Sequence, residues 1–244
     1  MNEVVIETRG ICKVYGGFAA VSDLSIQIQK GEIYALVGQN GAGKTTLMKM
    51  LCGLTPKTSG ELELFGVGTP NGLAASRRRI GAMIETPAFQ PYLSARENLE
   101  YLKIQRGSTD GNSVDAALKF VGLDYTGTKH FSKFSMGMKQ RLGLALAVMG
   151  KPELLILDEP INDLDPVGIK EFRDIMLQMN KENGTTILIS SHILGELSQI
   201  ATDYGFIDHG KLIRHITADE LEQKCGDDLE SYFIDLIGGG NRDE

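Results

Sequence analysis

Residues 38–46 form the stretch that most constrains how this chain can fold. They read Gly-Gln-Asn-Gly-Ala-Gly-Lys-Thr-Thr, which fits the pattern Gly-x-x-x-x-Gly-Lys-Ser/Thr. An apolar run, Ile33 to Val37, precedes them, and a helical pattern that starts at Leu47 follows. The sequence therefore predicts a strand, a glycine-rich loop and a helix in that order, which is the setting of a phosphate-binding loop.

Such a loop binds phosphate mainly through its backbone. Glycines let the N–H groups turn inward around an anion, and the helix start adds donors and the positive end of its dipole. Lys44 is expected to reach the β and γ phosphates of a nucleotide, and the hydroxyl of Thr45 to ligate Mg²⁺. The predicted nucleotide-binding residues of this loop are Gly38, Gln39, Asn40, Gly41, Ala42, Gly43, Lys44, Thr45 and Thr46.

A second block, Leu154 to Pro160, is an unbroken apolar run that ends in two acids. This pattern is typical of a fully buried strand of a parallel sheet, and ligands gather at the carboxyl ends of such strands. Asp158 is then placed to hold Mg²⁺, while Glu159 can polarise the water that attacks the γ phosphate. A buried strand followed by solvated acids has the same pattern, so the functional interpretation depends on the phosphate-binding loop.

The stretch Phe134 to Arg141 resembles the signature motif of ABC-type ATPases, usually Leu-Ser-Gly-Gly-Gln followed by a basic helix. Ser135 and Gly137 match, and they open an apolar helix where a hydroxyl and free N–H groups could receive a phosphate. In ABC proteins that phosphate belongs to ATP held by the opposite subunit. The resemblance therefore implies a second ATPase subunit, identical or closely paralogous, and a signature that acts in trans through Phe134, Ser135, Met136, Gly137 and Met138, of which the first, third and fifth depart from the usual wording.

Other landmarks of that family fall at matching places. Tyr15, ahead of the strand pattern Ser22 to Gln29, resembles the aromatic residue that stacks on adenine. His192 resembles the switch histidine that senses the γ phosphate, so the implied catalytic residues are Glu159, His192 and Lys44. The stretch Asn162 to Pro166 resembles the loop after the catalytic Glu, and its implied dimer contacts are Asn162 and Asp165.

Glu85 is the departure from the family that matters most. Counting back from Ser94 to Asn98, which resembles the start of the helix after the family's Gln loop, Glu85 falls where Gln normally stands. A carboxylate there could ligate Mg²⁺ together with Thr45 and Asp158, at the expense of extra negative charge beside the phosphates. Glu in this position, with Asn-x-Leu-Asp-Pro after the catalytic Glu, is similar to the ATPase subunits of bacitracin-type and lantibiotic-immunity exporters.

Size and composition limit the remaining possibilities. A chain of 244 residues with 42% hydrophobic content suffices for one α/β domain with a substantial core. The net charge of −7 weighs against nucleic-acid binding. No apolar stretch is long enough to span a bilayer and no signal-peptide pattern is apparent, so we expect a cytoplasmic protein without direct membrane insertion. The three cysteines, Cys12, Cys52 and Cys225, lack metal-like spacing and are interpreted as reduced thiols.

The order of elements predicts an α/β fold, and the resemblance makes it a P-loop NTPase of the ABC type. We expect a mostly parallel core sheet, an antiparallel β edge and an inserted helical subdomain. The expected ATPase domain covers 1–216, with its core at 1–85 and 151–216 and the helical subdomain at 86–150. Residues 217–244 are expected to form a short C-terminal helical extension and a flexible tail. Further expected elements are the strands Val4–Val14, Glu61–Phe65, Ile80–Ile84, Thr185–Ser190, Tyr204–Asp208 and Lys211–Ile216, and the helices Ser113–Val121, Pro166–Asn180, Ile193–Ala201 and Leu229–Ile237.

Together these features predict the ATP-binding and ATP-hydrolysing subunit of an ABC transporter, with ATP and Mg²⁺ as cofactors. The resemblance implies export of a peptide antibiotic or a similar amphipathic compound through separate membrane-spanning permease subunits, at the inner face of the membrane. Two alternatives stay open. A soluble ABC ATPase acting on ribosomes or DNA would normally carry a second cassette or a long coiled coil, and neither pattern is present. A catalytically weak, nucleotide-dependent regulatory module is the other, because of Glu85 and the altered signature.

Overall fold

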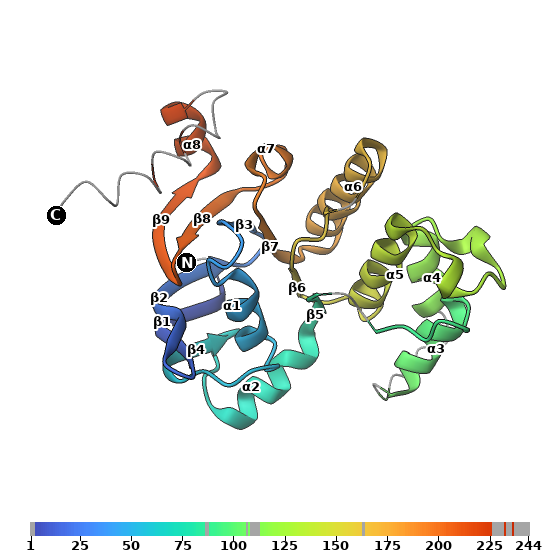
Figure 1. Cartoon of the computed structure of the whole chain (residues 1–244), viewed down its shortest axis with the longest axis horizontal. Helices are drawn as coiled ribbons and strands as arrows, with labels where there is room; N and C mark the ends of the chain where they lie inside the picture. The colour runs from blue at the N-terminus through green and yellow to red at the C-terminus, as the bar shows by residue number, and fades with distance from the viewer. Residues whose placement is uncertain are drawn as a thin grey trace.

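The computed structural model describes residues 3–85, 88–105, 107, 113–162, 164–225, 232 and 236. Its strands form two sheets (Figure 1). The antiparallel sheet has the order β2-β1-β4, and the core sheet has the order β5-β6-β7-β3-β8-β9. The strands are β1 Val4–Tyr15, β2 Phe18–Gln29, β3 Ile33–Val37, β4 Ser59–Leu64, β5 Ile80–Met83, β6 Leu154–Leu157, β7 Thr186–Ser191, β8 Asp203–Asp208 and β9 Lys211–Thr217.

The core sheet is parallel from β5 to β8, and only β9 runs antiparallel, beside β8. The predicted α/β class with a mostly parallel core sheet is thereby confirmed. The antiparallel strands expected at its flank form a separate sheet, and β9 adds an antiparallel edge to the core sheet itself.

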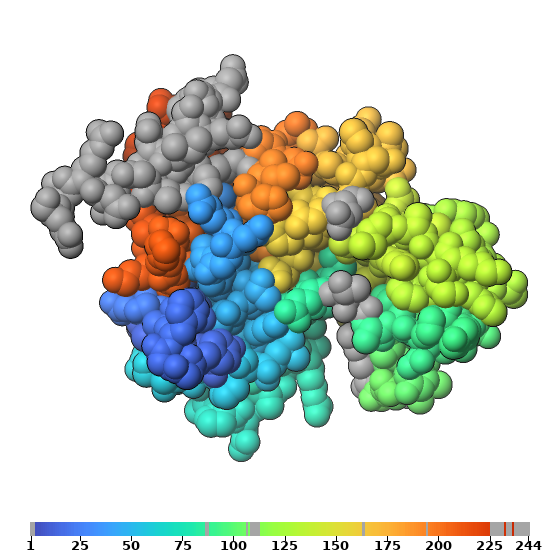
Figure 2. Space-filling model, viewed as in Figure 1, coloured from blue at the N-terminus to red at the C-terminus, as the bar shows by residue number. Residues whose placement is uncertain are grey.

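The helices lie in two groups (Figure 1). Helices α3 to α5 gather in one lobe at the right of the view, where α5 packs against β5 at the edge of the core sheet, while α1 and α2 lie near β4 and α6 and α7 lie beside the core sheet. The space-filling view shows the same lobe standing beside the body that contains the sheets (Figure 2). The helices are α1 Lys44–Leu51, α2 Pro70–Ser76, α3 Ala95–Gln105, α4 Ser113–Phe120, α5 Met136–Val148, α6 Pro166–Asn183, α7 Leu194–Leu197 and α8 Ala218–Cys225.

The central strands are continuous apolar runs because their successive side chains point to opposite faces of the core sheet and both faces are buried. In β3, Ile33, Ala35 and Val37 face one hydrophobic cluster, whereas Tyr34 and Leu36 face another. The strands β6 and β7 divide their side chains between the same two clusters. Because both faces of the core sheet are buried, neither face selects for polar residues. The site at the ends of these strands therefore stands on a rigid, two-sided core.

The phosphate-binding loop requires glycine at two positions because a side chain there would clash with neighbouring backbone. At one of them the backbone conformation also favours glycine. A Cβ on Gly38 would lie 2.4 Å from the carbonyl oxygen of Ile207, and one on Gly43 would lie 2.5 Å from that of Ala20. Gly43 also has φ of +108°, a conformation that other residues rarely adopt. The loop is thus packed against β2 and β8, and only glycine fits at these two positions.

Most expected elements are present, with end points that differ by a few residues. The helix expected over Ile193–Ala201 is the clearest error, because α7 covers only Leu194–Leu197. After it the chain turns, and Thr202 donates its N–H to Ile33 at the entry to β8. Sequence analysis also missed α2. The segment expected at Leu229–Ile237 lies outside the described residues except for Tyr232 and Leu236, which pack against the larger core cluster.

Among the described residues, we find no helix whose length and apolar character together would let it cross a bilayer.

Candidate nucleotide-binding and catalytic site

The phosphate-binding loop lines an open pocket of about 350 Å³ on the protein surface. The pocket combines the loop with the β1–β2 hairpin and one residue that follows β6. Its lining residues are Tyr15, Phe18, Ala20, Gln39, Asn40, Gly41, Ala42, Gly43, Lys44, Thr45, Thr46 and Glu159. The structure therefore brings together the predicted loop residues, the predicted base-stacking Tyr15 and the predicted catalytic Glu159, while Gly38 lies at the base of the loop.

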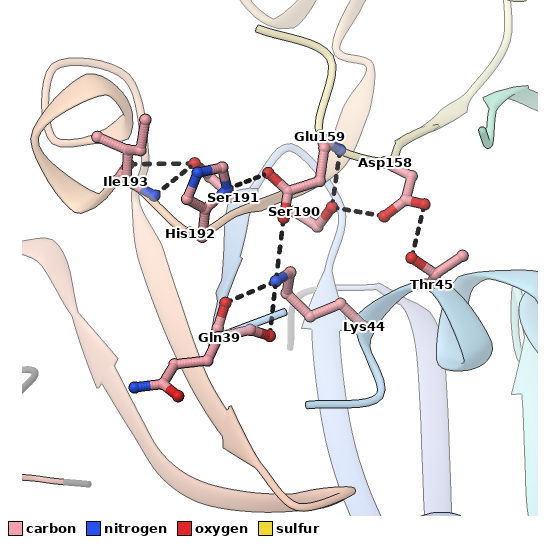
Figure 3. Close-up of polar contacts among 10 residues, drawn as sticks. Gln39, Lys44, Thr45, Asp158, Glu159, Ser190, Ser191, His192 and Ile193 are labelled. Carbon is pink, nitrogen blue, oxygen red and sulfur yellow. Dashed lines mark hydrogen bonds and ion pairs between the residues drawn. The ribbon is translucent and has the colours of Figure 1, made fainter. Parts of the chain in front are cut away.

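Lys44 is the buried cation of this pocket. Its Nζ donates to the carbonyl oxygens of Gly38 at 2.6 Å and Gln39 at 3.2 Å, and it lies 3.0 Å from Glu159 Oε1 (Figure 3). These contacts hold the ammonium group across the loop that leads into α1, and the first N–H groups of a helix have no partner within the helix. A phosphate group in the loop would thus meet Lys44 and the positive end of α1 together.

Thr45 and Asp158 supply oxygen ligands of the kind that Mg²⁺ prefers. Thr45 Oγ1 donates to Asp158 Oδ2 at 2.8 Å, so one hydroxyl and one carboxylate lie side by side at the edge of the pocket (Figure 3). No group of three or more His, Cys, Asp or Glu side chains that could enclose a metal occurs among the described residues. The Thr45 hydroxyl and the Asp158 carboxylate fit Mg²⁺, which usually takes one or two protein ligands and completes its coordination with phosphate and water.

Glu159 lies between two basic groups. His192 Nδ1 is 2.8 Å from Glu159 Oε2, and Lys44 approaches the other oxygen. Burial alone would raise the pKa of the Glu159 carboxyl, but the hydrogen bonds from Lys44 and His192 outweigh it, so the pKa lies below its ordinary value. Glu159 is thereby held as a carboxylate, the form that can accept a proton from water.

The backbone around Glu159 is unusual as well. Glu159 has φ of +48°, in the left-handed region that is uncommon for residues other than glycine. Its N–H donates to Ser190 Oγ at 2.9 Å, and Ser190 Oγ donates in turn to Asp158 Oδ1 at 2.8 Å. The end of β7 is thus tied by one hydroxyl to both acidic residues (Figure 3).

The β1–β2 hairpin forms the other end of the pocket. Lys13 Nζ lies 4.6 Å from the centre of the Tyr15 ring, and the Tyr15 hydroxyl is 3.3 Å from Thr55 Oγ1. Phe18 pairs with Tyr15 across the hairpin and is 67% exposed. The Tyr15 ring is therefore fixed by its neighbours while it faces the pocket.

The predicted signature residues lie apart from this pocket. Ser135 caps α5 and accepts a hydrogen bond from Met138 N at 3.3 Å, while Phe134 is buried against Phe131. In Figure 1 the start of α5 lies in the helical lobe, away from α1. Phe134 is thus an aromatic core residue where the usual motif has Leu, and Met136 is left exposed.

The predicted loop residues and Glu85 have local partners. Asp165 caps α6 by accepting from Gly168 N at 2.7 Å, and Asn162 N contacts Glu159 O at 3.4 Å. Glu85 Oε1 lies 2.6 Å from Lys49 Nζ and is not among the residues that line the pocket. In this structure the Glu85 carboxylate is thus paired with Lys49, one helical turn after Thr45 on α1.

Sequence reasoning missed three residues of the site. Phe18 and Ala20 line the pocket, and the Gly16-Gly17 turn could have indicated Phe18, because a tight hairpin brings its flanking residues together. Ser190 carries no comparable signal, since its role depends on β6 and β7 lying next to each other. The fold and the site together define a nucleoside triphosphate hydrolase of the P-loop class.

Comparisons with known proteins give the family. The ABC transporter family profile matches residues 21–162. The bacitracin transport ATP-binding protein BcrA of Enterococcus faecalis is 46% identical over 91% of this chain and 72% of its own length. The lantibiotic transport ATP-binding protein SrtF of Streptococcus pyogenes is 40% identical over 96% of this chain and 97% of its own length. The chain belongs to the ABC transporter family, and it is an ATPase.

Solved structures agree with the fold. An ATP-binding subunit of an ABC transporter matches with a TM-score of 0.84 and 26% identity, over 96% of this chain and 99% of the other. A dimeric ATP-binding cassette bound to ADP and Pi matches with a TM-score of 0.80 and 22% identity, over 87% of this chain and 98% of the other. The second match bears on the fold alone.

Proposed function

We propose that this chain is the ATP-hydrolysing subunit of an exporter for peptide antibiotics or similar amphipathic compounds, with a role in self-protection. The observation that carries this proposal is the 46% identity to a bacitracin transport ATP-binding protein over 91% of the chain. A lantibiotic transport ATP-binding protein at 40% identity supports the same class of cargo. The names of these relatives give no support to a role on ribosomes or DNA.

Catalysis in this proposal consists of positioning and charge neutralisation. Lys44 and the N–H groups of the loop bind the β and γ phosphates, and Thr45 and Asp158 hold the metal. Mg²⁺, when bound, neutralises the charge that develops on the phosphate oxygens. Glu159 accepts the proton of the attacking water, and His192, which hydrogen-bonds to Glu159, orients that carboxylate and contacts the γ phosphate.

The active unit in this proposal is a dimer with two composite pockets. The signature residues around Ser135 and Gly137 lie far from the loop of their own chain, so they serve ATP held by a second subunit. Asn162 and Asp165, which follow Glu159, are proposed to lie at that interface. Glu85 remains a proposed ligand or water-orienting residue, and it would have to leave Lys49 to act as one.

The proposed partners are membrane-spanning permease subunits, which would keep the protein peripheral at the inner face of the cell membrane. The division into a core at 1–85 and 151–216, a helical subdomain at 86–150 and an extension at 217–244 belongs to the same proposal. The helical lobe, with α3 to α5, offers a surface distinct from the sheets for a permease to contact.

The catalytic part is tested with the variant Glu159→Gln. We expect turnover to fall by about two to three orders of magnitude while ATP binding persists, because the amide cannot act as the base. Steady-state phosphate release and a nucleotide-binding titration measure the two properties. Hydrolysis near the wild-type rate would remove Glu159 from its assigned role.

The transport part is tested in cells. A tagged chain, expressed with its membrane partner in a sensitive host, should raise the concentration of bacitracin or lantibiotic needed to stop growth, and Glu159→Gln should abolish that protection. Copurification of the tagged chain with a polytopic membrane protein supports the assignment of partners. Copurification with ribosomes or DNA instead would contradict it.

A further inference from the structure

We propose that Ser190 is a positioning residue for hydrolysis, whose single hydroxyl sets both the Mg²⁺-binding carboxylate of Asp158 and the backbone of the catalytic Glu159. The inference rests on the proposed function, because it takes its meaning from the roles of Asp158 and Glu159. No feature of the sequence pattern assigns Ser190 such a role.

The register of the core sheet gives Ser190 its position. Leu157 pairs with Ile189 across β6 and β7, so the next residue on each strand is Asp158 and Ser190. On the other side of β7, Ser190 pairs with Leu36 of β3, the strand that leads into the phosphate-binding loop. Ser190 is fully buried, with 0% exposure. Ser190 therefore lies between the strand that leads into the phosphate-binding loop and the strand that leads to Asp158 and Glu159.

The direction of the two hydrogen bonds is settled by chemistry. A backbone N–H can only donate, so Ser190 Oγ must accept from Glu159 N at 2.9 Å. An ionised carboxylate can only accept, so the one hydroxyl proton of Ser190 must point to Asp158 Oδ1 at 2.8 Å. Both bonds require a group that donates and accepts at one atom, which Ala cannot supply.

The first consequence concerns the metal. Asp158 uses Oδ1 for Ser190 and Oδ2 for Thr45, so both oxygens of the carboxylate are held in one orientation. Oδ2, beside the Thr45 hydroxyl, is then presented to Mg²⁺. Without Ser190 the carboxylate loses one of its two fixed contacts, and binding of Mg²⁺ must first restrict its rotation.

The second consequence concerns the general base. Glu159 has φ of +48°, which is unfavourable for a residue with a side chain, and its N–H is satisfied by Ser190. Loss of the hydroxyl leaves this N–H without its partner and removes the contact that favours the left-handed conformation. The carboxylate of Glu159 would then spend less time in position against the attacking water.

The test compares Ser190→Ala with Ser190→Thr, which keeps the hydroxyl. For Ser190→Ala we expect kcat to fall about tenfold or more, with the KM for ATP changed less, because loop contacts to ATP are intact. A second readout needs no turnover. Mn²⁺ can replace Mg²⁺ on oxygen ligands, and its binding with a non-hydrolysable ATP analogue, followed by electron paramagnetic resonance, should weaken several-fold in Ser190→Ala. Ser190→Thr should recover most of both properties.

Thr186→Val is the matched control. Thr186 lies on the same strand, is also 0% exposed, and accepts an N–H from Gly31 at 3.0 Å, but it sits at the opposite end of β7. Each variant is assayed below its own unfolding temperature. Thr186→Val should lower stability and leave kcat and Mn²⁺ binding near wild type. Its loss of kcat to the same extent as Ser190→Ala would overturn the proposal.

Two further outcomes decide the matter. Wild-type kcat and Mn²⁺ binding in Ser190→Ala would also overturn the role of Ser190, as would a folded Ser190→Thr that is as poor as Ser190→Ala. The same assays on Glu159→Gln separate this result from the proposed function. Active Glu159→Gln would refute the base assignment itself, whereas inactive Glu159→Gln beside a fully active Ser190→Ala would refute only the positioning role.

Discussion

At the scale of single residues, nucleotide binding depends on the ion pair that Lys44 forms with Glu159. Lys44 contacts Glu159 at 3.0 Å, although the proposed roles give Lys44 to the phosphates and Glu159 to water. Phosphate entering the loop therefore competes with Glu159 for one buried ammonium group. Burial makes this competition stronger than it would be for an exposed ion pair.

This competition predicts a gain in affinity when Glu159 loses its charge. Without added metal, Glu159→Gln should bind ATP about fivefold more tightly than wild type, which corresponds to about 1 kcal/mol. A fluorescence or calorimetric titration in the presence of a chelator measures the change. Glu222→Gln, an exposed change of the same charge on α8, is the control. An equal gain there would attribute the effect to overall charge.

At the scale of elements, short sequence patterns can indicate where a helix begins, because helix caps depend on hydrogen bonds between residues close in the chain. Ser94 and Glu97, at the spacing of a capping box, form one before α3, with Ser94 N donating to Glu97 Oε2 at 2.7 Å and Glu97 N donating to Ser94 Oγ at 3.3 Å. The helix α2 was missed although Thr69 caps it and Pro70 occupies its first turn. Its seven residues give too short a hydrophobic pattern to recognise.

The contact between β5 and α5 yields a prediction about stability. A Cβ on Gly81 would lie 2.1 Å from the carbonyl oxygen of Ala147, so Gly81→Ala must push the helical lobe away from the core sheet. We expect a loss of about 2–3 kcal/mol in the free energy of unfolding. Gly150→Ala, where nothing lies within 4 Å of the added Cβ, should change it little. Denaturant unfolding of both variants decides the point.

A second prediction at this scale concerns pH. Arg79 donates two hydrogen bonds to Glu153, at the entries to β5 and β6, and these bonds hold the pKa of the Glu153 carboxyl below its ordinary value. A lowered pKa in the folded protein stabilises it above the ordinary pKa, and the contribution disappears as the pH falls through the folded value. Unfolding temperatures measured from pH 7 to 3 should therefore fall less steeply in Glu153→Gln. Parallel curves would contradict the prediction.

At the scale of the whole molecule, the sequence predicted the components of the fold better than their arrangement. The loop and the runs before Val37 and Leu157 stood out because strands buried on both faces are apolar throughout. The separate sheet of β1, β2 and β4 depends on pairing between distant segments, which no local pattern contains. Ser190 stayed hidden for the same reason. The pairing of Glu85 with Lys49 likewise requires three-dimensional placement.

The separation of α1 and α5 predicts a particular behaviour in mixtures. Lys44→Ala spoils the loop of its own chain, and Gly137→Arg spoils only the signature. Each variant alone should be inactive. A mixed dimer regains one intact pocket, which combines the unchanged loop of the Gly137→Arg variant with the unchanged signature of the Lys44→Ala variant. Phosphate release on mixing the two proteins, with their permease, measures the recovery. No recovery over the unmixed variants would argue against composite pockets.

The proposed stacking of adenine on Tyr15 has a consequence for how strongly this protein discriminates among nucleoside triphosphates. Lys13 covers one face of the ring and Thr55 engages the hydroxyl, so the hairpin offers an aromatic surface and no free side-chain group to read the rim of a purine. Stacking on a ring is nearly indifferent to which base is stacked. Guanosine and inosine triphosphates should therefore drive turnover at rates comparable with adenosine triphosphate, and preference among them in a living cell would follow their relative abundance.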